Sequence, residues 1–139
     1  MKLLKTLSIL LLLNILLVSC GSKDKTTLAL QGIAWKPIKV LDQKVAESSR
    51  AEMILKEDLS TNGSSGINRF IGQYKLSEPN GLTFGPLATT KMASLSAEDS
   101  AVEDKFFTAL TRTKKYKLEK DKLTLLNEQG KVLAIFKIK

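Results

Sequence analysis

The sequence predicts a mainly β domain with one helix, an α+β fold in which an antiparallel sheet curls into a barrel or sandwich capped by that single helix. Short runs that alternate apolar and polar residues recur along residues 28–139, and they predict about eight short strands. Apolar residues repeat at helical spacing in one stretch alone, between residues 102 and 113. Residues 28–139 are enough for one domain and too few for two.

The first strands are expected on either side of a polar loop. Residues 30–41 carry spaced apolar side chains and predict a strand that turns near Pro37. Residues 42–50 are mostly polar and predict a loop. In residues 51–56, Ala51, Met53 and Leu55 alternate with charged residues except at Ile54, as expected for a strand with one buried face and one apolar residue on the other.

A glycine-rich stretch, residues 61–75, is the most distinctive part of the domain. Glycine tolerates positive φ and close approach of another backbone, so Gly63 and Gly66 predict a tight bend that enters a strand. Gly72 predicts a bulge or a crowded crossing near the far end of that strand. The stretch therefore predicts a shaped loop that leads into a strand.

The middle of the chain predicts short extended segments and a turn. Residues 77–81 combine proline with an Asn-Gly pair, which is typical of a turn. Residues 82–84 alternate as a strand does, and the Gly-Pro pair at 85–86 is expected to break it. Residues 87–92 then predict one more extended segment.

The helix has two candidate N-caps. Ser100 is followed three residues later by Glu103, which is the spacing of a capping box. Ser96 and Asp99 form a second candidate with the same spacing. After the helix, alternation in residues 116–118, 123–125 and 132–138 predicts three strands joined by short turns.

The first residues predict a lipoprotein. Residues 1–19 have two lysines followed by an apolar run too short to span a membrane with these flanks, as in a signal peptide. The run ends in Leu-Val-Ser before Cys20, the pattern of the bacterial lipobox, in which the cysteine receives the lipid. Residues 20–27 then form a tether. We expect a chain anchored to the membrane of the cell envelope, with Gly21 after the cysteine favouring the outer membrane.

Residue types bearing on catalysis are scarce, so we expect no enzyme, no cofactor and no metal site. The chain has no histidine and a single cysteine, which the lipid would occupy. Glu98, Asp99, Glu103 and Asp104 form an acidic cluster, and paired carboxylates can act as acid and base. Carboxylates that complement the helix dipole are the simpler explanation.

The last quarter of the domain is basic and is the candidate interaction surface. Residues 105–139 carry ten basic and three acidic side chains. Alternation is expected to place lysines on one face of the last strands, opposite Tyr116, Leu118, Phe136 and Ile138. Anionic lipid headgroups are the expected partner, with an envelope protein as a further one; export excludes nucleic acid. A solvated face that keeps edge strands soluble is the alternative. The surface comprises Arg112, Lys114, Lys115, Lys117, Lys137 and Lys139.

Three motifs resemble the META domain (HslJ-like) family of bacterial envelope proteins. They are L-x-G-x-x-W from residue 30, G-x-x-G-x-N-x-F-x-G-x-Y from residue 63, and T-T-K-M-A from residue 89, and the likeness runs from Leu30 to Phe136. The resemblance implies an interaction module associated with stress or the envelope, and no catalytic residues. We expect the domain to be a monomer. The matching positions are Trp35, Gly63, Gly66, Asn68, Phe70, Gly72, Tyr74, Thr89, Thr90 and Met92.

One departure from the family concerns a pair of positions. The family often has cysteine where this chain has Ile67 and Ser94. Because both cysteines are replaced together, the resemblance implies that the two side chains are neighbours in the fold, with Cα atoms within about 7 Å.

Two function classes remain open. One is a non-catalytic lipoprotein module that binds through its surface. The other is a barrel that holds a small apolar ligand against its aromatic side chains, although filling of the core explains those residues equally well. Asn68 and Arg69 in the glycine-rich stretch are a candidate anion site, against the simpler role of an asparagine that bonds nearby backbone. The aromatic residues are Trp35, Phe70, Tyr74, Phe84 and Phe106.

We predict that Cys20 is the lipidated N-terminus of the mature protein. Metabolic labelling with a fatty acid should mark the wild-type chain and leave Cys20→Ser unlabelled, because the thiol accepts the diacylglycerol. Equal labelling of the two proteins would contradict the lipobox assignment.

Overall fold

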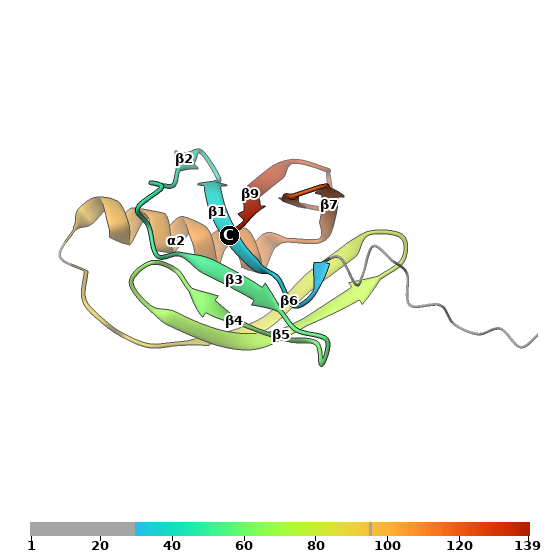
Figure 1. The fold of residues 1–139 in the computed structure, drawn as a ribbon, viewed down its shortest axis with the longest axis horizontal. Helices are drawn as coiled ribbons and strands as arrows, with labels where there is room; N and C mark the ends of the chain where they lie inside the picture. The colour runs from blue at the N-terminus through green and yellow to red at the C-terminus, as the bar shows by residue number, and fades with distance from the viewer. Residues whose placement is uncertain (1–29, 95) are drawn as a thin grey trace, which may run out of the picture.

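The computed structural model describes residues 30–94 and 96–139 and has an α+β fold, as the sequence predicts. The predicted signal peptide, Cys20 and the tether lie outside the described residues. A mostly antiparallel sheet forms a ring that is not a clean barrel, and one helix packs beside it (Figure 1). The elements are β1 (Ala34–Val40), β2 (Gln43–Lys44), β3 (Glu52–Leu55), β4 (Ser60–Ser64), β5 (Arg69–Ser77), β6 (Gly81–Thr89), α2 (Ala97–Arg112), β7 (Lys115–Glu119), β8 (Lys122–Leu126) and β9 (Val132–Ile138).

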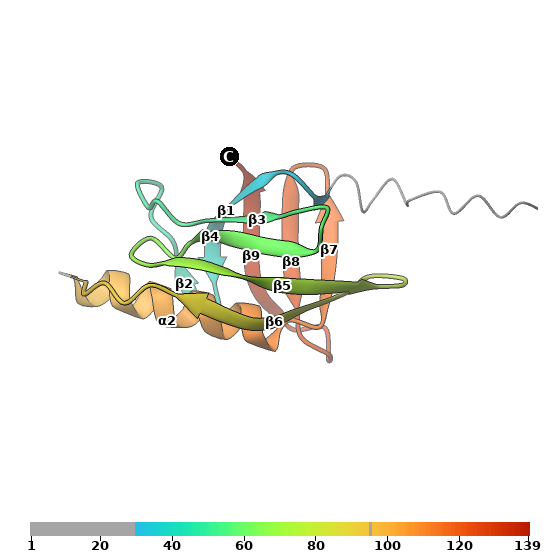
Figure 2. The same ribbon diagram turned by 90° about the horizontal axis from the view of Figure 1, so that it is seen from below.

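The nine strands follow the order β2-β1-β3-β4-β5-β6-β7-β8-β9, and β1 also pairs with β9 to close the ring. The pairing of β6 with β7 is the shortest in the sheet, because a single pair of Cα partners, Gly81 and Lys115, joins the two strands. Figure 2 shows β4–β6 crossing the direction of β7–β9, with α2 lying along β6. The helix contacts β6, β9, β1 and β8, and so covers the side where the strand ladder is weakest.

The core is centred on Phe106 of α2, which is fully buried. Its ring centroid lies 5.6 Å from that of Phe70 and 6.2 Å from that of Phe136, which brings together the helix, β5 and β9. Such pairs contribute about 0.5–1.5 kcal/mol each beyond the burial of their area. Val102, Ala109 and Leu110 complete the buried face of the helix.

The helix begins at Ala97, and its cap is Ser96 rather than Ser100. The side chain of Ser96 accepts a hydrogen bond from Asp99 N at 3.2 Å, which confirms the second candidate. The prediction for Ser100 is wrong, since its Oγ donates to Ser96 O from inside the first turn. Glu103 does not return a capping bond because its carboxylate binds Ser65 and Asn68 instead.

Of the three glycines in the glycine-rich stretch, Gly66 and Gly72 act as the sequence predicts and Gly63 does not. Gly63 does not bend the chain; it lies within β4 opposite Phe70, and a Cβ there would meet Glu52 O of β3 at 2.0 Å. The bend falls at the turn between β4 and β5, where Gly66 has a φ of +104°. The irregularity predicted at Gly72 is present, because the pairing of β5 with β6 shifts between Gly72 and Tyr74.

The predicted break at residues 85–86 is absent, and β6 continues through it. Gly72 pairs with Leu87 and Tyr74 with Phe84, so residues 85 and 86 together oppose a single residue of β5. This arrangement is a β-bulge. A bulge tolerates Pro86 because its missing N–H removes no ladder bond there. The polar segment 42–50, predicted as a loop, contains the two-residue strand β2.

Replacement of Ser96 by alanine should lower the free energy of unfolding by about 1 kcal/mol, because the Asp99 amide loses its acceptor. The matched variant Ser100→Ala should change it by less than about 0.5 kcal/mol, since alanine favours the helix interior. Urea denaturation monitored by circular dichroism measures both, and a larger loss in Ser100→Ala would contradict the cap.

Candidate functional site

Asn68, the centre of the glycine-rich stretch, is buried, and its side-chain amide is fully paired within the protein. Its Nδ2 donates to Met92 O at 3.3 Å and to Glu103 Oε2 at 3.2 Å. Its Oδ1 accepts from Thr90 Oγ1 at 2.9 Å and from Met92 N at 2.7 Å. An amide has two donors and one oxygen with two lone pairs, so no group of Asn68 is left for a ligand.

Ser65 completes this arrangement from the same turn. Its Oγ donates to Glu103 Oε1 at 2.5 Å and accepts from Asn68 N at 3.1 Å. The carboxylate of Glu103 therefore connects α2 to the β4–β5 turn, while Asn68 connects that turn to the segment after β6. We call the set of Ser65, Asn68, Thr90, Met92 and Glu103 the Asn68 clamp.

The acidic cluster predicted from the sequence is divided in the structure. Glu98 and Asp99 lie in the first turn of α2, and Asp99 N bonds the cap. Glu103 belongs to the Asn68 clamp, and Asp104 is exposed. The carboxylate of Glu103 is thus committed to a structural contact and is separated in role from the two acidic residues of the first helical turn.

The buried aromatic residues of the motifs also bond within the protein. Trp35 Nε1 donates to Leu30 O at 3.0 Å. The hydroxyl of Tyr74 donates to Lys56 O at 2.5 Å and accepts from Gln31 Nε2 at 2.6 Å. Burial raises the pKa of the Tyr74 hydroxyl, with Asp58 adding to the rise and the Gln31 bond opposing it. Trp35, Tyr74 and Phe106 pack in the core, whereas Phe84 is half-buried.

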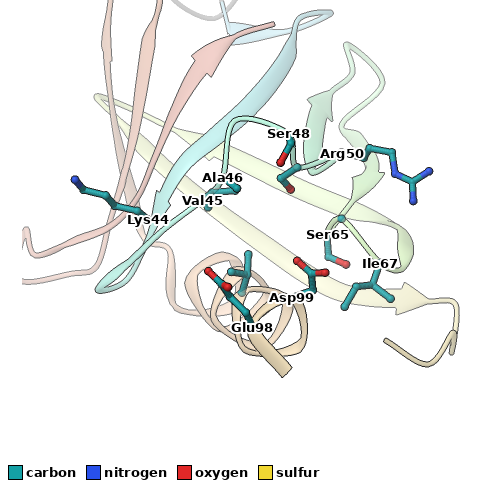
Figure 3. A pocket seen from close by; sticks show the side chains of 12 residues that line it. Lys44, Val45, Ala46, Ser48, Arg50, Ser65, Ile67, Glu98 and Asp99 are labelled. Atoms are coloured by element: carbon teal, nitrogen blue, oxygen red, sulfur yellow. The ribbon is translucent and has the colours of Figure 1, made fainter. Parts of the chain in front are cut away.

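Two surface hollows among the described residues border the glycine-rich stretch. The smaller, about 270 Å³, lies between the β2–β3 segment, the β4–β5 turn and the start of α2. Figure 3 shows Glu98 and Asp99 on its α2 side and Arg50 extending away from them, so the arginine does not oppose the carboxylates. The larger, about 810 Å³, is a groove that involves β3, β4 and β5.

The part of the chain that the structure describes contains no cluster of metal-ligand residues and no helix suited to crossing a membrane. In residues 30–94 and 96–139, no three Cys, Asp or Glu side chains gather closely enough to hold a metal ion. Over the same ranges, no helix combines the length and the apolar character that a membrane span requires.

Lysines gather on the outer face of β1, β9, β8 and β7. The register places Lys36 opposite Lys137, Lys137 opposite Lys122, and Lys122 opposite Glu119. Directly opposed residues point to the same face of a sheet. Phe136 of β9 is buried on the other face, so this row points outward.

A second row runs parallel to the first. Lys44 of β2 opposes Lys39 of β1, and Lys39 opposes Ile135 of β9. Ile135 in turn opposes Thr124 of β8, which opposes Lys117 of β7. Lys115 lies two residues before Lys117 on the same face. We call the combined surface the lysine face; its members are Lys36, Lys39, Lys44, Lys115, Lys117, Lys122 and Lys137.

Glu119 is the acidic residue within these rows. Its carboxylate lies 3.0 Å from Lys117 Nζ and 3.1 Å from Lys122 Nζ. Hydrogen bonds from Lys117 and Lys122 hold the pKa of Glu119 below its usual value. One carboxylate thus faces two ammonium groups, and the lysine face keeps a net positive charge.

The predicted basic surface and the lysine face overlap in part. Arg112 ends α2 and Lys114 precedes β7, so neither takes part in the strand rows. Lys139 Nζ forms an ion pair with Glu52 at 2.7 Å. Ile138, expected to be buried, is 46% exposed because it lies at the end of β9. The structure places Lys115, Lys117 and Lys137 on the lysine face and adds Lys36, Lys39, Lys44 and Lys122.

Comparison with protein families gives one match that covers most of the chain. The META domain family matches residues 28–139. The chain belongs to the META domain family. No curated protein matches it.

Solved structures with the fold of this META domain include two determined by NMR. One, from Burkholderia xenovorans, is 22% identical with a TM-score of 0.64, over 83% of this chain and 87% of that one. The second is 24% identical with a TM-score of 0.63, over 79% of this chain and 92% of that one. A DUF4847 family protein from Bacteroides vulgatus is 18% identical with a TM-score of 0.51, over 63% of this chain and 58% of that one. At these identities the likeness concerns the fold.

The META motif is largely a structural device in this chain. Trp35, Phe70 and Tyr74 fill the core, and Gly63 and Gly72 lie where a side chain would meet a neighbouring strand. Asn68 and Thr90 form the clamp, in which Met92 takes part through its backbone. Thr89 pairs with Phe70 at the end of β6.

The contact proposed between Ile67 and Ser94 stays a prediction. The Asn68 clamp holds the residue after Ile67 against Met92, two residues before Ser94. Ser94 Oγ itself donates to Ser96 O at 2.8 Å, next to the helix cap.

Asn68→Asp should lower the free energy of unfolding by about 3 kcal/mol at pH 7, because Glu103 and Met92 O lose a donor and two carboxylates are brought together. Repulsion should raise the pKa of the introduced carboxyl in the folded state. The variant should therefore keep its folding free energy below about pH 4, near the pKa of the carboxyl in the unfolded chain. It should lose that free energy as the pH rises through the raised pKa of the carboxyl in the folded chain.

Urea denaturation at pH 4 and pH 7 tests this expectation. Asn127→Asp is the matched control, since Asn127 uses only Oδ1, accepting from Lys131 N at 2.8 Å. A similar loss in both variants, or no recovery of Asn68→Asp at pH 4, would contradict the role assigned to the amide.

Proposed function

We propose that this META domain belongs to a lipid-anchored protein of the bacterial envelope and acts as a non-catalytic module that binds anionic lipid headgroups through the lysine face. The observation that supports this most is the register of β1, β9, β8 and β7, which aligns lysines from both ends of the domain on one outer surface. Each lysine near an anionic membrane contributes about 1 kcal/mol of attraction.

The expected anchor at Cys20 would make this weak attraction effective. Residues 21–29 separate that cysteine from the first described residue, and an extended chain spans about 3.3–3.6 Å per residue. The domain would thus stay close to the bilayer, where the local concentration of headgroups is high. The lysine face would then set how the domain is oriented on the membrane. Gly21 after the cysteine favours the outer membrane.

A barrel that holds an apolar ligand is less well supported. The interior is occupied by side chains, with Trp35, Tyr74, Phe106 and Phe136 fully buried. Three aromatic contacts join Phe106 to its neighbours at centroid distances of 5.6–6.2 Å. Of the aromatic residues predicted to line a ligand cavity, Phe70 contributes to a surface hollow.

Vesicle binding tests the proposal. The mature chain carrying Cys20→Ser should bind vesicles that contain anionic phosphatidylglycerol and should leave neutral phosphatidylcholine vesicles unbound. Replacement of Lys117, Lys122 and Lys137 by glutamine should weaken that binding at least tenfold, because about 1 kcal/mol is lost at each position. Binding should also fall as salt screens the charges.

A charge-matched control separates this face from net charge. Lys56, Lys75 and Lys91 are exposed lysines outside the lysine face, and their replacement by glutamine removes the same charge. The control should retain binding within about threefold. Equal loss in the two triple variants, or equal binding to both vesicle types, would contradict a specific role for the lysine face.

A further inference from the structure

The groove of about 810 Å³ is separate from the strands that carry most of the lysine face. Its floor is the outer face of β3, β4 and β5, where Ile54, Asn62 and Ile71 are opposed in register. The inner face of the same strands is buried, as at Met53, so this row points outward. Lys36 of β1 borders both surfaces.

Large apolar side chains are exposed in the groove. Ile71 is 63% exposed, and Met92, from the segment after β6, is 64% exposed. Both line the groove together with Ile54. Apolar side chains gathered in a surface hollow with a polar border are characteristic of a binding site.

A buried acceptor lies among these apolar side chains. Asn62 Oδ1 is the one buried side-chain oxygen or nitrogen in the described residues that has no hydrogen-bond partner. It lies between Ile54 and Ile71 in the register. Buried polar groups are nearly always paired, so rotation of the half-buried Asn62 amide toward the groove, where a ligand N–H or O–H group could pair its oxygen, would remove an unfavourable arrangement.

The border of the groove is cationic. Lys36, Arg50, Arg69 and Lys139 line it, and Glu52 is the acidic residue among the lining residues. Glu52 already pairs with Lys139 at 2.7 Å. Arg50 and Arg69 are exposed, and no ion pair involves either within the described residues. Guanidinium groups bind carboxylates through two parallel hydrogen bonds, so the charge favours an anionic partner.

We propose that this groove binds an acidic, partly apolar peptide segment of a partner protein. The arginines would bind its carboxylates, and Ile71 and Met92 would contact its apolar side chains. The Asn62 amide would rotate so that Oδ1, which is buried in the free domain, accepts a backbone N–H. A fatty acid meets the first two requirements and fails the third, because an ionised carboxylate on an alkyl chain has no donor. The groove is therefore a peptide site in addition to the lysine face.

NMR titration of the mature chain carrying Cys20→Ser tests the proposal with the capped peptide acetyl-ELELE-amide. Backbone amide signals of Ile71 and Arg69 and the side-chain amide signal of Asn62 should shift, with saturation at millimolar peptide or below. The lysine counterpart acetyl-KLKLK-amide should produce no such shifts. Laurate should bind at least tenfold more weakly than the acidic peptide.

Three variants measure how much Arg69, Asn62 and Ile71 each contribute to peptide binding. Arg69→Gln should weaken peptide binding at least fivefold, whereas Arg112→Gln, which removes an exposed arginine outside the groove, should leave it unchanged. Asn62→Leu should fold with undiminished stability, because it removes an unpaired acceptor, and should still weaken binding at least fivefold. Ile71→Thr should weaken binding similarly.

Several results would overturn the proposal. One is the absence of saturable shifts at the groove signals. Others are shifts confined to the lysine face, equal binding of the basic peptide or of laurate, and a well-folded Asn62→Leu variant that binds the peptide as the wild type does.

Discussion

The hydrogen bonds of Asn68 are the interaction on which the rest of this domain depends. The ladder between β6 and β7 has a single pair of Cα partners, so strand pairing alone closes the ring weakly on that side. The helix covers this side. Within the Asn68 clamp, Glu103 joins the helix to the β4–β5 turn, and Asn68 joins that turn to the segment after β6 through its bonds with Met92. The buried amide has every group paired, and such an arrangement specifies one geometry because any shift leaves a buried polar group unpaired.

Closure of the ring also explains why lysines that are far apart in the sequence lie together on the lysine face. The pairing of β1 with β9 brings Lys36 beside Lys137, and β8 then adds Lys122. On the inner face of β9, Phe136 packs against Phe106 of the helix. Side chains alternate between the two faces of β9, so Phe136 points inward to the core contact and Lys137 points outward to the lysine face.

The fold class, the helix and the C-terminal strands followed from the sequence because their signals are local. Alternation identified β7, β8 and β9, and the spacing of apolar residues identified α2. The errors arose where distant contacts decide the outcome. Glu103 was assigned to a capping box, but its partners are more than thirty residues away. Pro86 was assigned to a break, but the extra residue of a bulge accommodates it against β5. Three of the seven residues of the lysine face, Lys36, Lys39 and Lys44, join it only through the β1–β9 pairing. The unpaired acceptor of Asn62 likewise depends on neighbours in two other strands. No local sequence pattern predicts either feature.

A double-mutant cycle between Asn68 and Glu103 tests the central claim most directly. The free energies of unfolding of Asn68→Ala, Glu103→Ala and the double variant, measured by urea denaturation, give the coupling between the two side chains. Their contact at 3.2 Å within one network predicts a coupling of about 1–2 kcal/mol, so that the double variant loses less than the sum of the single losses. A coupling below about 0.5 kcal/mol would mean that the two residues act independently and would contradict the clamp.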